Sequence, residues 1–381
     1  MKILYFSPTP YQDIKQRPQH LAEELSKYHE LWYVDPTVSG MRCLKADGIH
    51  CNAYQYDVNP NLHVLRLNGL LAAHIKLQHY DKFALNTWLE RHQLHALLSS
   101  VDVIWIGYEA CYRFLFPFRL RNSSMKKRPL LVYDKMDDNV FLEKHPSIQK
   151  FLLNMRNALE HDADVIFVTA SLFYETLSSK RSNVFLVQNG IGLEGYHYDS
   201  PLCAGNELVQ AKNFGYIGMM GHWFDNDLIR SFALAFPECT VSLVGPLATE
   251  KILLPNVRYY GVVPKNQVYH WIEQFDACLY PFKKGPLLDT IDPVKIYEYL
   301  LVNKPVIAAD SKEMAKYKGL IYTYETQEEF LQICGKQELA LPFSTDQERT
   351  LFFQKNSWEE RAGKILDVIE GLQNRMSRRT L

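Results

Sequence analysis

The chain has 381 residues, 47% of them hydrophobic, and its 42 lysine and arginine residues against 43 aspartate and glutamate residues give a formal charge of −1. This length predicts two domains, each large enough to bury a core of its own. The balance of charge excludes the strongly basic class of nucleic-acid-binding proteins, so we expect no nucleic-acid partner.

Cysteine usage and hydropathy indicate the compartment. The seven cysteines include no Cys-x-x-Cys pair, which argues against a zinc site or a disulfide scaffold and fits a reducing environment. The N-terminal stretch MKILYFSP turns polar too early for a signal peptide. No apolar run reaches the ~18 residues that a transmembrane helix needs. We therefore expect a soluble, cytoplasmic protein.

Apolar segments that read as strands alternate with helical patterns in two series. The first series is residues 2–7, 30–36, 101–108, 129–136, 164–170 and 184–190, and the second is residues 213–218, 240–245, 257–261, 277–282 and 305–309. Helical patterns such as 17–28 and 81–100 separate several of them. Continuous apolar strands with helices between them predict parallel sheets covered on both faces. The turn-rich stretch 191–212 between the series predicts two α/β domains.

The segment DPVKIYEYLLVNKPVIAAD, residues 292–310, predicts a helix followed at once by a strand. Asp292 is expected as the helix N-cap and Pro293 as the first helical residue. Lys295 falls in the first turn, where the helix dipole disfavours a cation unless an anion lies nearby.

The position of this helix suggests what the anion is. Ligands of open parallel sheets bind at the carboxyl ends of the strands, and the helix follows a strand there. The free amides of the first turn, together with Lys295, are therefore predicted to hold a phosphate. Glu298, on the same helix face, would accept hydrogen bonds from a ribose diol. The alternative is an exposed Lys295–Glu298 pair with no ligand.

The same segment resembles the donor-site helix of GT-B glycosyltransferases, written loosely as P-x-K-x-x-E-x-x-x-x-G-x-P-V-I. Four further stretches resemble segments of these enzymes in the right order: VFLVQNGIGLEGY, FGYIGMMGHWFDNDLI, NVRYYGVVPKNQVYHWIEQFDACLYPF and SWEERAGKILDVI. In the first half, KQRPQHLAEELSKYHELWYVDP and LLVYDKMDDNVF resemble bacterial glycosyltransferases of cell-surface polysaccharide assembly, including the teichuronic-acid type.

This resemblance implies an α/β fold of two Rossmann-like domains with a cleft between them. Residues 1–195 would bind the acceptor, residues 196–360 the nucleotide sugar, and residues 361–381 would form a helix that crosses back to the first domain. The implied reaction moves a sugar from a nucleotide-diphosphate donor to a hydroxyl of a glycan or glycolipid in surface polysaccharide biosynthesis. Alternatives are a GT-B-like nucleotide-sugar epimerase or hydrolase, or a non-catalytic protein that binds sugar nucleotides.

The resemblance also assigns residues to the donor and leaves out cofactors. The expected donor-binding set is Lys295, Glu298, Gly218, Gly221, His222, Gly245, Thr290, Asp292 and Val294. GT-B enzymes generally need no metal, so we expect none to be obligatory. The nucleotide base, the sugar, the acceptor and the oligomeric state stay open.

Two positions depart from the family pattern. Thr290 stands where many retaining GT-B enzymes carry a second glutamate, eight residues before Glu298, and this departure favours inversion. Asn303 replaces the usual glycine after the helix. Asparagine tolerates the left-handed conformation of a helix end, so the second change is benign.

The stretch GYIGMMG, residues 215–221, lacks the G-x-G core of a dinucleotide fingerprint. A nicotinamide-dependent dehydrogenase is therefore a distant alternative. In the glycosyltransferase interpretation, Gly221 and His222 lie in a turn that faces the phosphates, with the imidazole as a donor to the diphosphate. The alternative makes His222 an ordinary loop residue beside Trp223.

The stretch YDKMDDN, residues 133–139, places carboxylates after a strand of the first domain. Asp137 or Asp138 is expected to be the base that deprotonates the acceptor hydroxyl, provided that burial or crowding raises its pKa. Because adjacent side chains diverge, at most one of them can do so. The alternatives are an N-cap of the following helix and, last, a metal site.

Two further features suggest contacts with anions. The segment RFLFPFRLRNSSMKKR, residues 113–128, has six basic residues, three phenylalanines and no acid. It is typical either of a peripheral contact with the inner face of the cell membrane or of a solvated basic face. Arg17 begins the first helix and is expected to face the cleft, where it would meet an anionic acceptor or the donor phosphate; otherwise it pairs with Glu23 or Glu24.

Overall fold

The computed structural model describes residues 1–13, 15–36, 54–66, 94, 96–115, 128–192, 208–336 and 338–379. The chain divides into two compact units. The N-terminal unit comprises Met1–Thr169, Phe173–Gln188 and Arg361–Leu381, and the C-terminal unit comprises Ala170–Leu172 and Asn189–Glu360. The N-terminal part of the first unit thus ends at Gln188, whereas the sequence predicted this boundary at residue 195.

The N-terminal unit is built on an eight-stranded sheet of order β3-β4-β2-β1-β5-β6-β7-β8. Its strands are β1 (Lys2–Phe6), β2 (Glu30–Asp35), β3 (Tyr54–Asn59), β4 (Leu62–Arg66), β5 (Val103–Ile106), β6 (Leu130–Lys135), β7 (Val165–Val168) and β8 (Val184–Leu186). Neighbouring strands are parallel except for the antiparallel β3–β4 pair. The sequence predicted the six buried strands and missed this pair at the edge.

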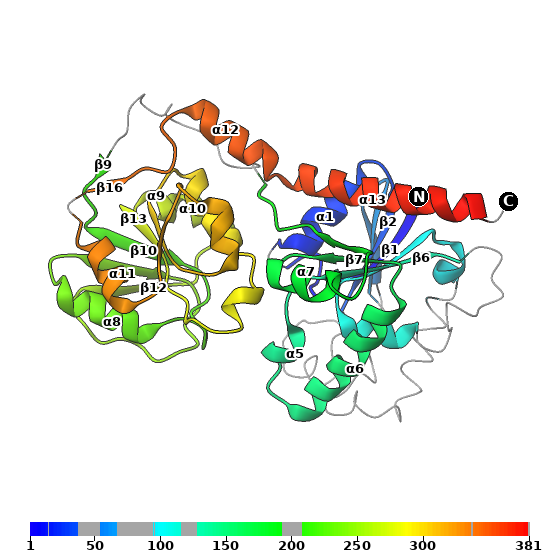
Figure 1. Cartoon of the computed structure of the whole chain (residues 1–381), viewed down its shortest axis with the longest axis horizontal. Helices are drawn as coiled ribbons and strands as arrows, with labels where there is room; N and C mark the ends of the chain where they lie inside the picture. The colour runs from blue at the N-terminus through cyan, green and yellow to red at the C-terminus, as the bar shows by residue number, and fades with distance from the viewer. Residues whose placement is uncertain are drawn as a thin grey trace. The chain divides into compact units, whose positions relative to one another are not determined.

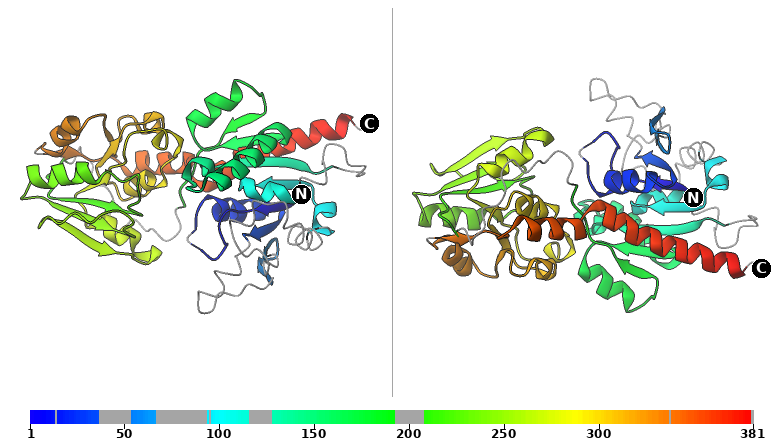
Figure 2. Two further views of the ribbon diagram at one scale, coloured as in Figure 1. Left: turned by 90° about the horizontal axis from the view of Figure 1, so that it is seen from below. Right: turned by 90° about the horizontal axis from the view of Figure 1, so that it is seen from above.

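Helices flank this sheet. They are α1 (Arg17–Ser26), the 3₁₀ helix η2 (Glu109–Phe114), α5 (Asn139–Leu142), α6 (Pro146–Asp162), α7 (Ser171–Ser178) and α13 (Trp358–Arg379). The part of α13 that belongs to this unit runs beside it in Figure 2, and Glu370 Oε1 lies 3.8 Å from His29 Nε2. Of the helix expected at 81–100, the structure describes only Leu94 and residues 96–100, which are helical.

The C-terminal unit has a six-stranded, wholly parallel sheet of order β12-β11-β10-β13-β14-β15. Its strands are β10 (Asn213–Ile217), β11 (Thr240–Val244), β12 (Val257–Gly261), β13 (Ala277–Tyr280), β14 (Val306–Ala309) and β15 (Tyr322–Tyr324). A separate two-stranded sheet pairs β9 (Leu208–Val209) with β16 (Leu339–Ala340).

Helices cover both faces of the six-stranded sheet. They are α8 (Asn226–Ala235), α9 (Val268–Glu273), α10 (Val294–Leu301) and α11 (Gln327–Cys334). The unit also contains α12 (Asp346–Lys355) and the 3₁₀ helices η4 (Lys265–Gln267), η5 (Leu288–Thr290) and η6 (Lys312–Tyr317). Figure 1 shows α9 and α10 on one face and α8 with α11 on the other. The rings of Phe232 on α8 and Phe330 on α11 lie 6.0 Å apart in the core.

The start of α10 differs from the sequence prediction, and its end agrees with it. Pro293 is the N-cap and supplies no side-chain bond, so the prediction that Asp292 caps this helix is wrong. At the other end Asn303 takes a left-handed φ of 54°. Its amide bonds Leu300 O and that of Lys304 bonds Tyr299 O, which is a Schellman ending. The predicted role of Asn303 is therefore confirmed.

The described cysteines Cys111, Cys239, Cys278 and Cys334 are free and buried. Among the residues that the structure describes, no helix is both long and apolar enough to cross a membrane.

Candidate functional site

Two glycines bring the ends of neighbouring strands together in the C-terminal unit. Gly218 follows β10 with φ 150°, and Gly245 follows β11 with φ 129°. A Cβ on Gly245 would lie only 2.2 Å from the carbonyl oxygen of Gly218. The amide of Gly218 in turn bonds Val244 O at 2.8 Å. Neither position can hold a side chain, and the strand edge therefore presents bare backbone.

Lys295 extends from α10 over this edge. A Cβ on Gly218 would lie 2.2 Å from Lys295 Cε and 2.8 Å from its Nζ. Within the described part of the chain, neither Lys295 nor Glu298 has a hydrogen bond or ion pair through its side chain. The Lys295–Glu298 pair that was the alternative prediction does not form, although both side chains are partly exposed.

The first turn of α10 adds backbone donors beside this cation. Pro293 gives the first amides no side-chain cap, so the amides of Val294 and Lys295 begin the helix with neither a capping side chain nor an intrahelical partner. Amides at a helix N-terminus attract anions. Lys295, the glycine edge and these amides together favour a ligand with two adjacent phosphate groups.

The turn after β10 lies at the same edge. Met220 N bonds Pro246 O at 2.9 Å, and Phe224 N bonds Gly221 O at 3.0 Å. His222 is exposed, and its ring meets that of Trp223 edge to face at 4.9 Å. No hydrogen bond of its imidazole to a described residue is present. His222 is thus available to a ligand. Its role as a donor to the diphosphate stays a prediction.

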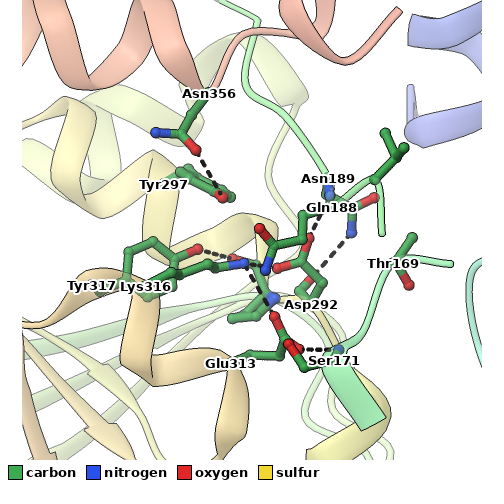
Figure 3. Close-up of polar contacts among 12 residues, drawn as sticks. Thr169, Ser171, Gln188, Asn189, Asp292, Tyr297, Glu313, Lys316, Tyr317 and Asn356 are labelled. Atoms are coloured by element: carbon green, nitrogen blue, oxygen red, sulfur yellow. Dashed lines mark hydrogen bonds and ion pairs between the residues drawn. The ribbon is translucent and has the colours of Figure 1, made fainter. Parts of the chain in front are cut away.

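Two residues of the predicted donor set are engaged inside the protein. Thr290 is buried, and its hydroxyl donates to Leu287 O at 2.7 Å. The Asp292 carboxylate is also buried and accepts from Lys316 Nζ and from the amide of Asn189 (Figure 3). Both predictions of direct substrate binding are therefore wrong: these side chains face internal partners at the base of α10.

The partners of Asp292 form a buried ionic cluster, which consists of Asp292, Glu313 and Lys316. Glu313 accepts from the amide of Ser171 and lies 3.6 Å from Lys316 Nζ (Figure 3). Burial lowers the pKa of Lys316, but the Asp292 carboxylate, together with Tyr297 and Glu313, outweighs burial, so that the pKa of Lys316 is raised. Burial raises the pKa of Asp292 against the opposing effect of Lys316. A raised pKa of Asp292 disfavours its charged form, whereas a raised pKa of Lys316 favours its charged form. The two hydrogen-bond donors on Asp292 favour its ionised form.

In the N-terminal unit, Arg17 is a structural residue. It is 4% exposed, its Nη2 lies 2.9 Å from Asp134 Oδ1, and its Nη1 donates to Val187 O at 2.9 Å. The prediction that Arg17 meets an anionic ligand, or else pairs with Glu23 or Glu24, is therefore wrong. The apolar strand β6 buries Asp134, and a buried carboxylate needs such a cation.

The two candidate bases have different environments. Asp138 caps α5 by accepting from Phe141 N at 3.1 Å, and its Oδ1 also lies 3.0 Å from Arg156 Nη1. Asp137 has no hydrogen bond or ion pair to any residue that the structure describes. Asp138 thus serves as the cap, the role that the sequence offered as an alternative, and the assignment of Asp137 as the base stays a prediction.

Electrostatics single out the same carboxyl group. Burial, the nearby Glu109 carboxylate and the adjacent Asp138 together raise the pKa of Asp137 to about 6, against the opposing effect of Arg17. The side chain is nevertheless exposed, so water and an acceptor hydroxyl can reach it. A carboxyl group with a raised pKa near neutrality suits general-base catalysis.

Glu109 is not among the residues that the sequence predicted for the site. It follows β5, next to β6 in the sheet, and is 1% exposed. Tyr133 donates to its Oε1 at 2.7 Å and Asn139 to its Oε2 at 2.8 Å. The signal was present: an acid directly after a buried strand falls at the same sheet edge as the residues after the next strand.

Two predictions stay untested. Of the basic segment 113–128, residues 116–127 lie outside the described part of the chain, and Arg128 pairs with Asp164. Among the described residues, no group of three or more histidine, cysteine or acidic side chains is placed to hold a metal ion.

Comparisons with known proteins bear on fold and class. No protein-family model matches the chain. A relative from Bacillus subtilis strain 168, named provisionally as the teichuronic acid biosynthesis glycosyltransferase TuaH, is 26% identical over 274 residues, 65% of this chain and 68% of that protein. Sucrose-phosphate synthase from Thermosynechococcus elongatus is a similar solved structure, with a TM-score of 0.63 and 12% sequence identity over 100% of this chain and 99% of that one. Anabaena HepE in complex with UDP has a TM-score of 0.62 and 13% sequence identity over 97% of this chain and 100% of that one. The predicted GT-B fold and the resemblance to teichuronic-acid-type glycosyltransferases are confirmed.

Proposed function

We propose that the chain is a glycosyltransferase that moves a sugar from a nucleotide-diphosphate donor to a hydroxyl of a glycan or glycolipid in cell-surface polysaccharide assembly. The observation that carries this proposal is the ammonium of Lys295, which lies over Gly218 with no hydrogen bond or ion pair to a described residue. Charge-assisted contacts to phosphate are among the stronger hydrogen bonds in proteins.

The C-terminal unit supplies the donor contacts in this proposal. Lys295 and the first amides of α10 hold the diphosphate, with His222 as a further donor, and Glu298 accepts from the ribose hydroxyls. Gly218, Gly245 and Gly221 let the phosphates approach the backbone. We name uridine as the base to test first, because HepE was solved in complex with UDP.

The N-terminal unit supplies the base. The Asp137 carboxylate takes the proton of the acceptor hydroxyl as that oxygen forms a bond to the anomeric carbon of the sugar. The bond from this carbon to the phosphate oxygen breaks, and the nucleoside diphosphate leaves with the electron pair. Lys295 and the α10 amides stabilise the negative charge on this leaving group.

No metal has a role in this proposal. EDTA should therefore leave the rate of transfer unchanged after purification without divalent ions. Loss of activity in EDTA that Mn²⁺ or Mg²⁺ restores would contradict it.

Product analysis tests the proposal against its alternatives. Purified protein is incubated with UDP-, GDP- and dTDP-sugars, with and without a bacterial glycolipid fraction, and nucleotide and sugar products are separated. A transferase releases nucleoside diphosphate at a rate that depends on the acceptor. Isomerised donor would indicate an epimerase, acceptor-independent release a hydrolase, and tight binding without turnover a non-catalytic binding protein.

We also propose that the protein associates peripherally with the inner face of the membrane through segment 113–128. The support is the composition of that segment, which has six basic residues and three phenylalanines. The protein should sediment with vesicles that contain anionic phosphatidylglycerol and not with neutral phosphatidylcholine vesicles. Equal behaviour with both would contradict this localisation.

A further inference from the structure

Glu109 is an unusual carboxylate in the N-terminal unit. It is 1% exposed, yet its side-chain hydrogen-bond partners among the described residues are the neutral groups of Tyr133 and Asn139. No ion pair of Glu109 with a described residue is present. Buried carboxylates are normally paired with a cation, as Asp134 is with Arg17 in the same unit. Burying a carboxylate without a cation destabilises the fold, so Glu109 is a candidate for a functional role.

The contacts of Glu109 lead to the candidate base. Asn139, which donates to Glu109 Oε2 at 2.8 Å, begins α5 and stands two residues after Asp137. The Asp138 carboxylate, which accepts from Phe141 N, fixes the same turn. Asp137 thus directly precedes two anchored residues, Asp138 and Asn139, while its own side chain makes no bond to a described residue.

The charges around Asp137 come from three places. Glu109 on η2 and Asp138 in the turn are negative, and Arg17 on α1 is positive but already pairs with Asp134. Further charged groups act on the residues next to Glu109: Glu160 and Arg156 of α6 on Tyr133, and Arg113 of η2 with Glu143 of the α5–α6 connection on Tyr108. Glu160 and Arg156 have ionic partners in Lys135 and Asp138.

We propose that Glu109 is a positioning residue for the Asp137 base: its hydrogen bond to Asn139 fixes the turn that carries Asp137, and its charge strengthens Asp137 as a proton acceptor. This inference rests on the proposed function in one respect, that Asp137 is the base. The coupling between the two carboxyl groups can be measured without any turnover.

Charge and position can be separated by substitution. Glu109→Gln removes the charge and keeps the shape. The glutamine oxygen still accepts from Tyr133, and a rotated Asn139 amide accepts from the new N–H. Asn139→Ala does the reverse, since it keeps the Glu109 charge and loses the hydrogen bond. Glu143→Gln is the matched control for loss of a nearby negative charge, because Glu143 acts on Tyr108 and not on Asp137.

The first experiment is a carbon-13 NMR titration of the aspartate side-chain carboxyl groups in the full chain, with Asp137 assigned from Asp137→Asn. Glu109→Gln should lower the titration midpoint of Asp137 by about one pH unit, and Glu143→Gln should leave it unchanged. An unchanged midpoint in folded Glu109→Gln would overturn the role of its charge. Equal shifts in both variants would do the same.

The second experiment is the pH profile of transfer. Glu109→Gln should move the acid limb of kcat/KM to lower pH by the same amount as the NMR midpoint. Asn139→Ala should keep that limb in place and lower kcat by about 10- to 100-fold, because the base is misplaced, with KM for the donor unchanged. Wild-type kcat in Asn139→Ala would overturn the positioning role. The Asn139→Ala variant still tests this role if Glu109→Gln does not fold.

Failure of the two proposals would look different. A chain with no transferase activity that still shows the NMR shift would contradict the proposed function and keep the coupling. An active transferase without the shift would contradict only the coupling.

Discussion

At the scale of single residues, the structure separates side chains that have partners from side chains that lack them. Arg17, Asp138 and Asp292 all have internal partners. Lys295, Glu298 and Asp137 have none among the described residues. Charged side chains without protein partners at the ends of parallel strands are the ones available to a ligand.

Lys295 provides the first prediction. Lys295→Ala should weaken the binding of donor and of free nucleoside diphosphate alike, about tenfold or more, because a charge-assisted phosphate contact contributes about 1.5–3 kcal/mol. Isothermal titration calorimetry with nucleoside diphosphate measures this. Lys304→Ala is a suitable control, since Lys304 bonds Glu273 O on another part of the unit. Wild-type affinity in Lys295→Ala would contradict the proposed site.

Asp137 provides the second. Asp137→Asn should lower kcat by about 10²–10⁴-fold with donor affinity unchanged, because a general base typically contributes that much. In wild type, activity should fall as pH drops through about 6, since protonation at the raised pKa of Asp137 removes the base. Steady-state kinetics from pH 5 to 8 measure both effects.

Asp138 is the comparison for that experiment. Asp138→Asn keeps a side-chain oxygen for Phe141 N and loses the Arg156 ion pair, so it should change kcat much less. Near-wild-type rates in both asparagine variants would show that neither aspartate is the base.

Sequence alone could not distinguish these two aspartates. Both stand in one turn, and what separates them is Arg156, eighteen residues away along the chain, which reaches Asp138. The errors at Arg17 and Asp292 have the same origin. The sequence shows that a charged residue stands at a strand end, but the partner that buries it, Asp134 or Lys316, lies far away in the chain.

At the scale of elements, the helix–strand unit from α10 to β14 shows what local pattern determines. Its start, its end and the following strand agree with the sequence to within about a residue because each follows from local backbone chemistry. The edge hairpin of β3 and β4 was missed, since none of the six β3 residues is buried and the strand gives no apolar run.

The end of α10 provides the third prediction. Asn303 has a φ of 54°, accepts from Phe343 N at 3.0 Å and donates to Phe343 O at 3.3 Å. Asn303→Ala should destabilise the protein by about 2–3 kcal/mol, from about 1–2 for the left-handed backbone and about 1 for the lost hydrogen bonds. Urea unfolding measures the change.

Asn303→Gly is the matched variant for that measurement. Glycine adopts the left-handed conformation freely, so this variant should lose only the bonds to Phe343 and fall between wild type and Asn303→Ala. Equal stability of the alanine and glycine variants would show that backbone conformation is not what asparagine supplies here.

At the scale of the whole molecule, the alternation of strands and helices was enough to predict two α/β units. It did not predict how the chain divides between them. Ala170–Leu172 belongs to the C-terminal unit although the residues on both sides belong to the first. The hydrogen bond from Ser171 N to Glu313 fixes that short segment. A local sequence pattern cannot predict a contact with a residue so far along the chain.

The ammonium of Lys295, which has no partner among the described residues, implies a trade-off between stability and binding. A cation in the first turn of a helix opposes the helix dipole, at a cost of about 0.3–1 kcal/mol. Lys295→Gln should therefore melt at a higher temperature than wild type when no nucleotide is present. With saturating nucleoside diphosphate the order should reverse, because ligand that binds only the native state stabilises the tighter-binding protein more. Differential scanning fluorimetry across a nucleotide titration should show the melting temperatures of the two proteins crossing. If the melting temperatures of both proteins instead rise in parallel with nucleotide concentration, Lys295 does not contact the ligand.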